Sequence, residues 1–204
     1  MTLEHNTKRM FEFVQIPENY WEDRLSRIQE GPHKAVILDW FEDLPININE
    51  GKGLYLYGEY GVGKSSIAAM LLKGALAHGK FGLWTNFKPL PQYYKSPKDY
   101  MFDGYSSMFQ KMLSTPILVV DELAVAPKDW WPIEIFEEVI RTRVQKRLST
   151  IITSNHPPTY FTDGLERRAS KDEKKIADIT QGLISILTEA VDSCHVIGED
   201  LRKV

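Results

Sequence analysis

Cysteine is nearly absent from this chain. Cys194 is the only one among 204 residues, which excludes an intramolecular disulfide and fits a reducing compartment. Histidines are few as well, and the five at positions 5, 33, 78, 156 and 195 show no pairing typical of zinc ligands. A disulfide-stabilised secreted fold and a structural zinc site are therefore both disfavoured.

The sequence also lacks long apolar runs and an excess of basic residues. It has no stretch of about 18 apolar residues, and its opening, MTLEHNTKRM, has no apolar signal-peptide core. The formal net charge is −3, so any contact with a polyanion must be local. We therefore expect a soluble, cytoplasmic protein with no membrane partner.

Short apolar runs alternate with segments of helical spacing. Helices are predicted over 33–41, 65–79, 132–147 and 170–191, from apolar periodicity, from a proline at a helix start and from a capping box. Strands are predicted at GLYLYG (53–58), FGLWTN (81–86), PILVV (116–120), TIITSN (150–155) and CHVI (194–197). This alternation indicates an α/β fold with a mostly parallel five-stranded sheet between helices.

The stretch GEYGVGKSS at 58–66 matches the pattern GxxxxGK[ST]. Glycine allows backbone angles that turn successive N–H groups inward, and the N-terminus of the following helix adds positive potential. The motif lies between a predicted strand and a predicted helix, the context of a phosphate-binding loop; Lys64 would then contact the β- and γ-phosphates of ATP, and the Ser65 hydroxyl would bind Mg²⁺. The predicted nucleotide-binding residues are Gly58, Glu59, Tyr60, Gly61, Val62, Gly63, Lys64, Ser65 and Ser66.

Two acidic residues, Asp121 and Glu122, directly follow the most apolar predicted strand. Ligands of open α/β sheets bind at the carboxyl ends of the strands, where these side chains would lie. Asp121 is predicted to hold Mg²⁺, and Glu122 to polarise an attacking water. The alternative is a pair of acids that only leads the strand into a surface loop.

The strand TIITSN also ends on polar residues. Asn155 is the candidate contact to the γ-phosphate or to the attacking water, although residues 154–158 would equally make an ordinary turn. His156 is interpreted as structural. Lys64, Glu122 and Asn155 together make up the predicted catalytic set.

Five stretches carry a resemblance to a known family: IPENYW (16–21), GLYLYGEYGVGKSS (53–66), LVVDEL (118–123), RTRVQKRLSTIITSN (141–155) and GEDLRK (198–203). Together they resemble the AAA+ ATPase module of bacterial DnaC/DnaI-type helicase loaders and of the related IstB-type transposition helpers. The resemblance implies a P-loop NTPase of AAA+ type. Residues 1–30 would be an N-terminal arm or short docking helix, 31–160 the ATP-binding core, and 161–204 a small helical lid region with a terminal strand.

The resemblance also implies a function. It points to an ATP-dependent helper of DNA replication that binds ATP and Mg²⁺, self-associates on binding ATP, and contacts single-stranded DNA and a replicative helicase. One alternative is an IstB-like transposition helper, which would bind duplex DNA and a transposase. Others are a non-hydrolysing, ATP-gated regulator of a helicase, or a P-loop kinase, which the acidic pair and the TSN tip fit less well than attack by water.

The N-terminus departs from the family's pattern. Only about 30 residues precede the ATPase, too few for the separate domain with which such loaders grip a helicase. The arm that contains Met10, Phe11, Phe13 and Val14 would either dock as a short helix or pack on its own core.

A second departure concerns the arginine finger. Its position by resemblance falls in the triplet 185–187, where Ile186 cannot stabilise transition-state charge. Unless Arg143, Arg167 or Arg168 substitutes, ATP hydrolysis by the isolated chain is expected to be slow.

The segment 81–111 is a candidate surface for single-stranded DNA. Aromatic rings stack on bases and lysines follow the phosphates, so their interleaving suits a single strand. The alternative is that the rings belong to the core and to a proline-rich surface loop. The residues concerned are Phe81, Trp84, Phe87, Tyr93, Tyr94, Tyr100, Phe102, Tyr105 and Phe109, with Lys88, Lys95, Lys98 and Lys111.

Overall fold

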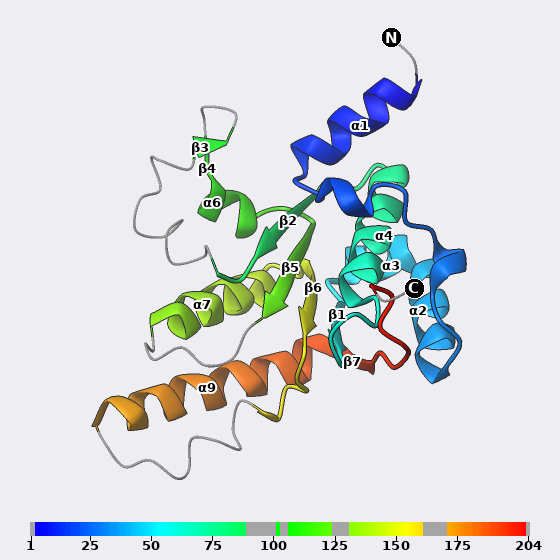
Figure 1. Cartoon of the computed structure of the whole chain (residues 1–204). Helices are drawn as coiled ribbons and strands as arrows, with labels where there is room; N and C mark the ends of the chain where they lie inside the picture. Colours follow the sequence, from blue (N-terminus) through cyan, green and yellow to red (C-terminus); the bar gives the residue numbers. More distant parts are fainter. Residues whose placement is uncertain (1–2, 89–100, 103–105, 124–130, 161–170, 203–204) are drawn as a thin grey trace.

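The chain folds around one parallel sheet. A computed structural model describes residues 3–88, 101–102, 106–123, 131–160 and 171–202 (Figure 1). The five strands run in the order β2-β5-β6-β1-β7, and every neighbouring pair is parallel. They are β1 (Gly53–Tyr57), β2 (Gly82–Asn86), β5 (Ile117–Leu123), β6 (Ser149–Ser154) and β7 (Val191–His195). The predicted parallel five-stranded sheet is thereby confirmed.

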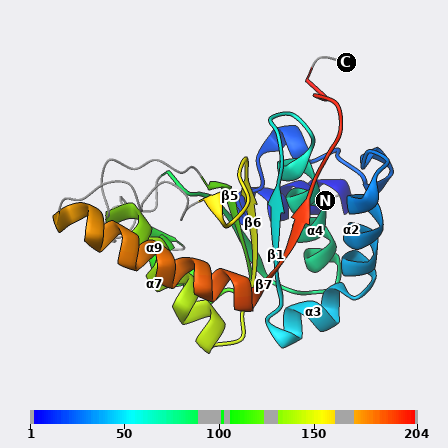
Figure 2. The same cartoon turned by 90° about the horizontal axis from the view of Figure 1, so that it is seen from below.

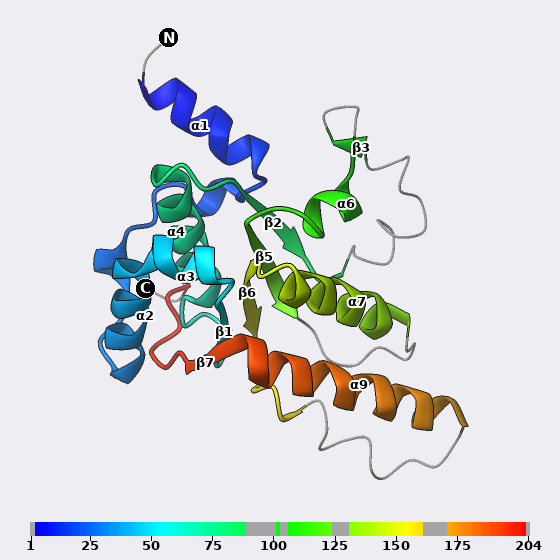
Figure 3. The same cartoon turned by 180° about the vertical axis from the view of Figure 1, so that it is seen from behind.

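Helices cover both faces of the sheet. Figure 2 shows α2 (Pro32–Glu42), α3 (Leu44–Glu50) and α4 (Lys64–Ala77) on one side. On the other side α7 (Trp131–Gln145) and α9 (Lys171–Ala190) lie next to each other (Figure 3). A short hairpin, β3 (Met101–Phe102) with β4 (Ser106–Ser107), precedes α6 (Met108–Met112). In the described part of the chain, no helix is both long and apolar enough to cross a bilayer.

The alternation of side chains along β1 divides the core into two layers. Leu54 and Leu56 are fully buried on the α2–α4 side, whereas Tyr55 is fully buried on the α7–α9 side. Successive residues of a strand point to opposite faces, so a strand that is apolar throughout must be covered on both. This is why GLYLYG, with no polar face, becomes a central strand.

The N-terminal arm packs on this core. It consists of α1 (Leu3–Phe13) and two single-turn 3₁₀ helices, η1 (Glu18–Tyr20) and η2 (Leu25–Arg27). Val14 is fully buried, and its carbonyl accepts a 2.8 Å hydrogen bond from the backbone N–H of Trp84 in β2. Of the four apolar residues named in the predicted docking arm, only Met10 is left largely exposed, while α1 itself extends away from the sheet (Figure 1).

Residues 161–204 were predicted as a small lid region with a terminal strand, and α9 and β7 of this region pack on the rest of the sheet. Leu183 and Leu187 of α9 are buried in the layer shared with α7. Strand β7 pairs in parallel with β1, with Val191 beside Gly53 and His195 beside Tyr57. This edge strand was predicted at 194–197 but begins at residue 191. The polar residues at 192–193 made its first part look like a loop.

Candidate nucleotide-binding site

The loop between β1 and α4 has the backbone that its glycines allow. Gly61 and Gly63 have positive φ angles of 81° and 99°, which strain residues with a side chain. A Cβ atom at Gly58 would lie 2.1 Å from the Val196 carbonyl oxygen, so a larger residue would push the loop away from the C-terminal segment. Helix α4 begins at Lys64, directly after the loop, and its N-terminal N–H groups and dipole favour an anion there.

The side chain of Lys64 contacts this loop. Its Nζ donates hydrogen bonds to the carbonyl oxygens of Gly58, at 2.8 Å, and Glu59, at 2.6 Å. Burial lowers the pKa of Lys64, and the nearby carboxylate of Asp121 opposes this effect. The ammonium is thus a buried cation at the start of α4, in the position from which a lysine reaches phosphate oxygens.

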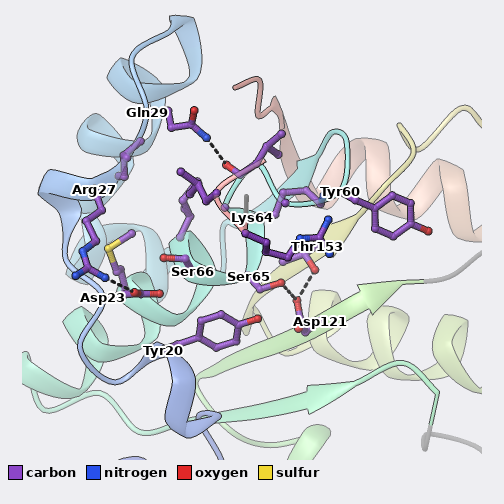
Figure 4. Close-up of a pocket in the computed structure, with 18 of the residues that line it drawn as sticks. Tyr20, Asp23, Arg27, Gln29, Tyr60, Lys64, Ser65, Ser66, Asp121 and Thr153 are labelled. Carbon is purple, nitrogen blue, oxygen red and sulfur yellow. Dashed lines mark hydrogen bonds and ion pairs between the residues drawn. The ribbon is translucent and has the colours of Figure 1, made fainter. Parts of the chain in front are cut away.

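Asp121 joins the loop to the neighbouring strand. One of its carboxylate oxygens, Oδ1, accepts hydrogen bonds from the Ser65 hydroxyl at 2.7 Å and from the Thr153 hydroxyl at 2.6 Å (Figure 4). A buried carboxylate next to a serine hydroxyl is a hard-oxygen pair that suits Mg²⁺. No cluster of three or more His, Cys, Asp or Glu side chains that would hold a metal ion occurs among the described residues. Water and phosphate oxygens would complete the coordination of an ion at Ser65 and Asp121.

Glu122 occupies a strained position. Strand β5 was predicted to end at Val120, but it continues to Leu123 through a register shift, and Glu122 has φ 58°. Its backbone N–H donates a 2.9 Å hydrogen bond to Thr153 Oγ1, and its side chain is exposed. A bulge with a positive φ re-aims the side chain at the carboxyl end of the strand. Glu122 therefore presents its carboxylate at the site instead of burying it in the sheet.

A cavity of about 830 Å³ lies over these groups. The predicted residues 60–66, Asp121, Glu122 and Asn155 all line it, whereas Gly58 and Glu59 do not. Tyr60 is 64% exposed, and its ring points away from the other labelled side chains (Figure 4). His156 stacks on Tyr160 with ring centroids 3.8 Å apart, in keeping with a structural role.

The cavity also has walls that the sequence reading missed. Most of these residues are distant in the chain from the phosphate-binding loop, so no local sequence pattern links them to it. The stretch IPENYW (16–21) contributed to the family resemblance, but no role was assigned to its residues. The missed residues are Asn19, Tyr20, Asp23, Arg27, Ile28 and Gln29 before the sheet, Ile67 and Met70 on α4, Thr153 and Ser154 on β6, and Leu201 and Arg202 at the end.

Residues 196–202, here called the C-terminal strap, cross the phosphate-binding loop. The backbone N–H of Val196 donates to the Tyr57 carbonyl at 2.7 Å, and that of Leu201 to the Gly61 carbonyl at 3.0 Å. Gln29 fastens the strap from the other side, because its amide both accepts from the Glu199 N–H and donates to the Glu199 carbonyl.

The strap brings Arg202 to the cavity. The Arg202 guanidinium forms an ion pair with Asp200 at 2.9 Å and lines the cavity together with Lys64. It is exposed, and hydrogen bonding to Asp200 raises its pKa. Among the described residues, Lys64, Arg27 and Arg202 are thus the cations that line this cavity.

The arginine positions proposed from the sequence lie elsewhere. Arg143 is a possible substitute for the finger by sequence, but it is fully buried, and its guanidinium donates to the Thr150 hydroxyl and to the Met112 and Thr115 carbonyls. Because the group is enclosed and its donors are used within the fold, it is not available to a nucleotide on this chain or on a neighbouring copy. Ile186 packs against the core, and Arg167 and Arg168 lie outside the described residues.

The candidate single-strand surface at 81–111 is mostly core where the structure describes its side chains. Trp84, Phe87 and Phe109 are buried and unavailable to stack on bases. Phe81 is 46% exposed, but its ring contacts Phe13 edge-on at 5.2 Å between centroids. Lys88 is exposed and Lys111 half-buried; Phe102 lies in β3, and Tyr93, Tyr94, Lys95, Lys98, Tyr100 and Tyr105 lie outside the described residues.

Comparison with known proteins places this site and fold among relatives. Residues 45–172 match the family described as IstB-like ATP binding protein. The replicative helicase loader DnaI of Bacillus subtilis (strain 168) is 26% identical over 162 residues, which cover 75% of this chain and 50% of the relative. The chain therefore spans half the length of that relative.

Solved structures share the fold. The crystal structure of the DnaC helicase loader matches with a TM-score of 0.68 and 24% identity, covering 89% of this chain and 100% of that chain. A crystal structure of DnaI matches with a TM-score of 0.70 and 19% identity, covering 95% and 100%. The replication initiator DnaA bound to AMPPCP and single-stranded DNA matches with a TM-score of 0.62 and 14% identity, covering 90% and 51%. The predicted AAA+ fold is thereby confirmed.

Proposed function

Because the chain belongs to the IstB-like ATP binding protein family, we propose that it is an ATPase that binds ATP with Mg²⁺ and hydrolyses it slowly as a helper of DNA replication. One observation carries the proposal. A single carboxylate oxygen of Asp121 receives the hydroxyls of Ser65, from the phosphate-binding loop, and Thr153, from the neighbouring strand, beside the exposed carboxylate of Glu122. This arrangement joins a metal-binding pair to a candidate base.

The phosphates would lie on the loop and the first turn of α4. Backbone N–H groups of residues 61–66 and the Lys64 ammonium would bind them, and Ser65 and Asp121 would hold Mg²⁺. Mg²⁺ in such a site neutralises charge that develops on the phosphoryl group. Lys64 must then exchange its two carbonyl partners, Gly58 and Glu59, for phosphate oxygens.

Hydrolysis depends on residues at the tips of β5 and β6. Glu122 polarises the attacking water, and Asn155, half-buried in the cavity wall, contacts that water or the γ-phosphate. Thr153 orients the Asp121 carboxylate through its 2.6 Å hydrogen bond. Arg202 contributes positive charge from the same chain, and the lack of an arginine at position 186 keeps turnover slow.

The nucleoside would lie against the wall formed by the N-terminal arm. Tyr20, Ile28 and Met70 line this part of the cavity and offer apolar and aromatic surface to a purine, while Asn19 offers a polar group. Selectivity among bases would arise here, since the phosphate-binding loop reads no base.

The relatives support the proposed biological role. DnaI is a replicative helicase loader, and this chain matches half of it, so the proposed partners are a replicative helicase, single-stranded DNA and further copies of the chain on ATP binding. The match to an IstB-like family keeps an IstB-like transposition helper as the second candidate. A pull-down from host cells with ATP present separates the two, because it recovers either a helicase or a transposase.

Turnover measurements test the enzyme activity. We expect slow release of phosphate from ATP, which Glu122→Gln stops while ATP affinity is kept, and which Lys64→Ala stops by preventing ATP binding. Wild-type turnover in Glu122→Gln would contradict the role of that carboxylate. Absence of ATP binding by the wild-type chain would refute the proposed function as a whole.

A further inference from the structure

Lys73 makes an unusual set of contacts with the N-terminal arm. Its ammonium donates hydrogen bonds to three backbone carbonyl oxygens, those of Tyr20 at 2.8 Å, Trp21 at 3.0 Å and Asp23 at 2.6 Å. An ammonium group has three N–H donors, so all three are used. Its nitrogen also lies 6.0 Å from the centroid of the Phe11 ring. The side chain is therefore committed to a single segment of the chain.

That segment has little regular structure of its own. Between Val14 and Pro32 the backbone forms only the single-turn helices η1 and η2, so few ladder hydrogen bonds hold it. Other side-chain contacts supplement Lys73: the Trp21 indole N–H donates to the Ile16 carbonyl at 2.8 Å, Arg27 pairs with Asp23 at 3.3 Å, and the Gln29 amide bonds the Glu199 backbone. The same segment supplies Asn19, Tyr20 and Asp23 to the cavity wall.

Helix α4 connects this segment to the phosphate-binding loop. Its first turn carries Lys64 and Ser65, its next turns put Ile67 and Met70 in the cavity wall, and Lys73 follows one turn after Met70. Lys73 is the ninth residue after Lys64 in α4, which corresponds to a rise of about 13 Å along the helix axis. A rigid helix thus sets the distance between the phosphate end of the cavity and the wall held by Lys73.

We propose that Lys73 is a positioning residue for nucleotide selectivity: it fixes the turn at 20–23 on α4, so that this wall is preformed to receive the nucleoside of the bound nucleotide. The inference rests on the proposed nucleotide binding and adds a residue that touches no part of the ligand. A preformed wall binds the nucleoside without a further loss of conformational entropy. A loose wall must be ordered on binding, and this entropic cost lowers the affinity.

Burial and nearby carboxylates act on the pKa of Lys73 in opposite directions. Burial lowers the pKa of Lys73, and the carboxylates of Asp23 and Glu22 oppose this effect. Methionine is a matched replacement, because it keeps an unbranched chain of similar length and loses all three donors. Lys80, whose Nζ bonds Asn49 at 2.6 Å and which does not line the cavity, supplies the control Lys80→Met.

The test compares two ligands by calorimetry with Mg²⁺: ATP, and inorganic tripolyphosphate, which has no nucleoside. In Lys73→Met we expect ATP to bind about tenfold more weakly, equivalent to about 1.4 kcal/mol, and tripolyphosphate to bind as in the wild type. Lys80→Met should bind both ligands normally. An equal loss for both ligands, or no loss for ATP, would overturn the proposal.

If the wild type binds neither ligand, nucleotide binding itself is refuted. A second measurement then tests separately whether Lys73 holds the turn at 20–23. Hydrogen exchange of the backbone amides at 18–28 should be about tenfold faster in Lys73→Met than in the wild type or Lys80→Met, with exchange in α4 unchanged. Equal exchange in the three proteins would show that Lys73 does not hold this turn.

Discussion

The hydroxyl of Thr153 donates a 2.6 Å hydrogen bond to Asp121 Oδ1 and accepts another from the backbone N–H of Glu122 at 2.9 Å. Thr153 therefore contacts both acidic residues of the site from the adjacent strand, and it is fully enclosed. It sets the orientation of the carboxylate that would bind Mg²⁺ and stabilises the positive φ of its neighbour. The sequence reading assigned the polar tip of this strand to Asn155 and overlooked Thr153.

Thr153→Val tests this role, since valine keeps the shape and removes the hydroxyl. The buried carboxylate would lose one of its two hydroxyl donors, so we expect a loss of about 1–3 kcal/mol in Mg²⁺-dependent ATP binding or turnover. Thr153→Ser restores the donor and should retain most of the activity. Normal turnover and normal Mg²⁺ dependence in Thr153→Val would contradict the assigned role.

Gly61→Ala tests the contact between the phosphate-binding loop and the C-terminal strap. A Cβ atom there would lie 1.8 Å from Asp200 Oδ1, at a φ of 81°, so the Asp200 side chain must move and the loop backbone is strained. Gly79→Ala is a matched control, because Gly79 has φ 70° and no atom within 4 Å of an added Cβ. Both variants should lose about 1 kcal/mol of stability from backbone strain, but only Gly61→Ala should also lose ATP affinity. Equal ATP affinity in the two variants would show that the contact between the loop and the strap does not affect nucleotide binding.

Arg143→Met tests whether this arginine is structural. The substitution leaves the Met112, Thr115 and Ser149 carbonyls without their buried donor, and we expect a loss of about 3 kcal/mol or more in the free energy of urea unfolding. Arg141→Met removes an exposed ion pair with Glu137 and should cost less than about 1 kcal/mol. Turnover per folded molecule should be unchanged in both, and a selective loss of turnover in Arg143→Met would contradict the structural assignment.

Cys194 predicts a dependence of stability on pH. Burial raises the pKa of this thiol to about 11, above the value of 9.0 for a free thiol. Between these values the unfolded chain loses the proton and the folded chain keeps it, so stability falls as pH rises from about 9 to about 11. Cys194→Ala should reduce this loss by about 1–2 kcal/mol, measured by urea unfolding at pH 8 and pH 11. Parallel stability curves for the two proteins would rule out the thiol as a cause.

The sequence predicted those features that are local in the chain. The phosphate-binding loop, the acidic pair after β5 and the alternation of strands and helices each depend on neighbouring residues, so the pattern alone was sufficient. The positions of Lys64, Ser65, Asp121, Glu122 and Asn155 around one cavity follow from a parallel sheet, whose strands place their carboxyl ends at the same edge.

The features that escaped prediction depend on contacts between distant segments. The arginine-rich stretch 141–147 has the spacing of a solvated helix face, yet Arg143 is buried because three carbonyls from other elements converge on it. Likewise, no periodicity reveals that residues 19–29 and the C-terminal strap meet at the loop, since the hydrogen bonds of Gln29 to Glu199 join opposite ends of the chain.

The C-terminal strap has a consequence for synthesis of the protein. Its contacts with Tyr57 and Gly61 close over a loop made early in translation, but they form only after residues 196–202 have left the ribosome. Strand β7, which pairs with the central strand β1, also emerges at this late stage. A nascent chain thus carries a complete GKSS motif without this wall until residues 196–202 emerge, and competence to capture nucleotide tightly arises only then.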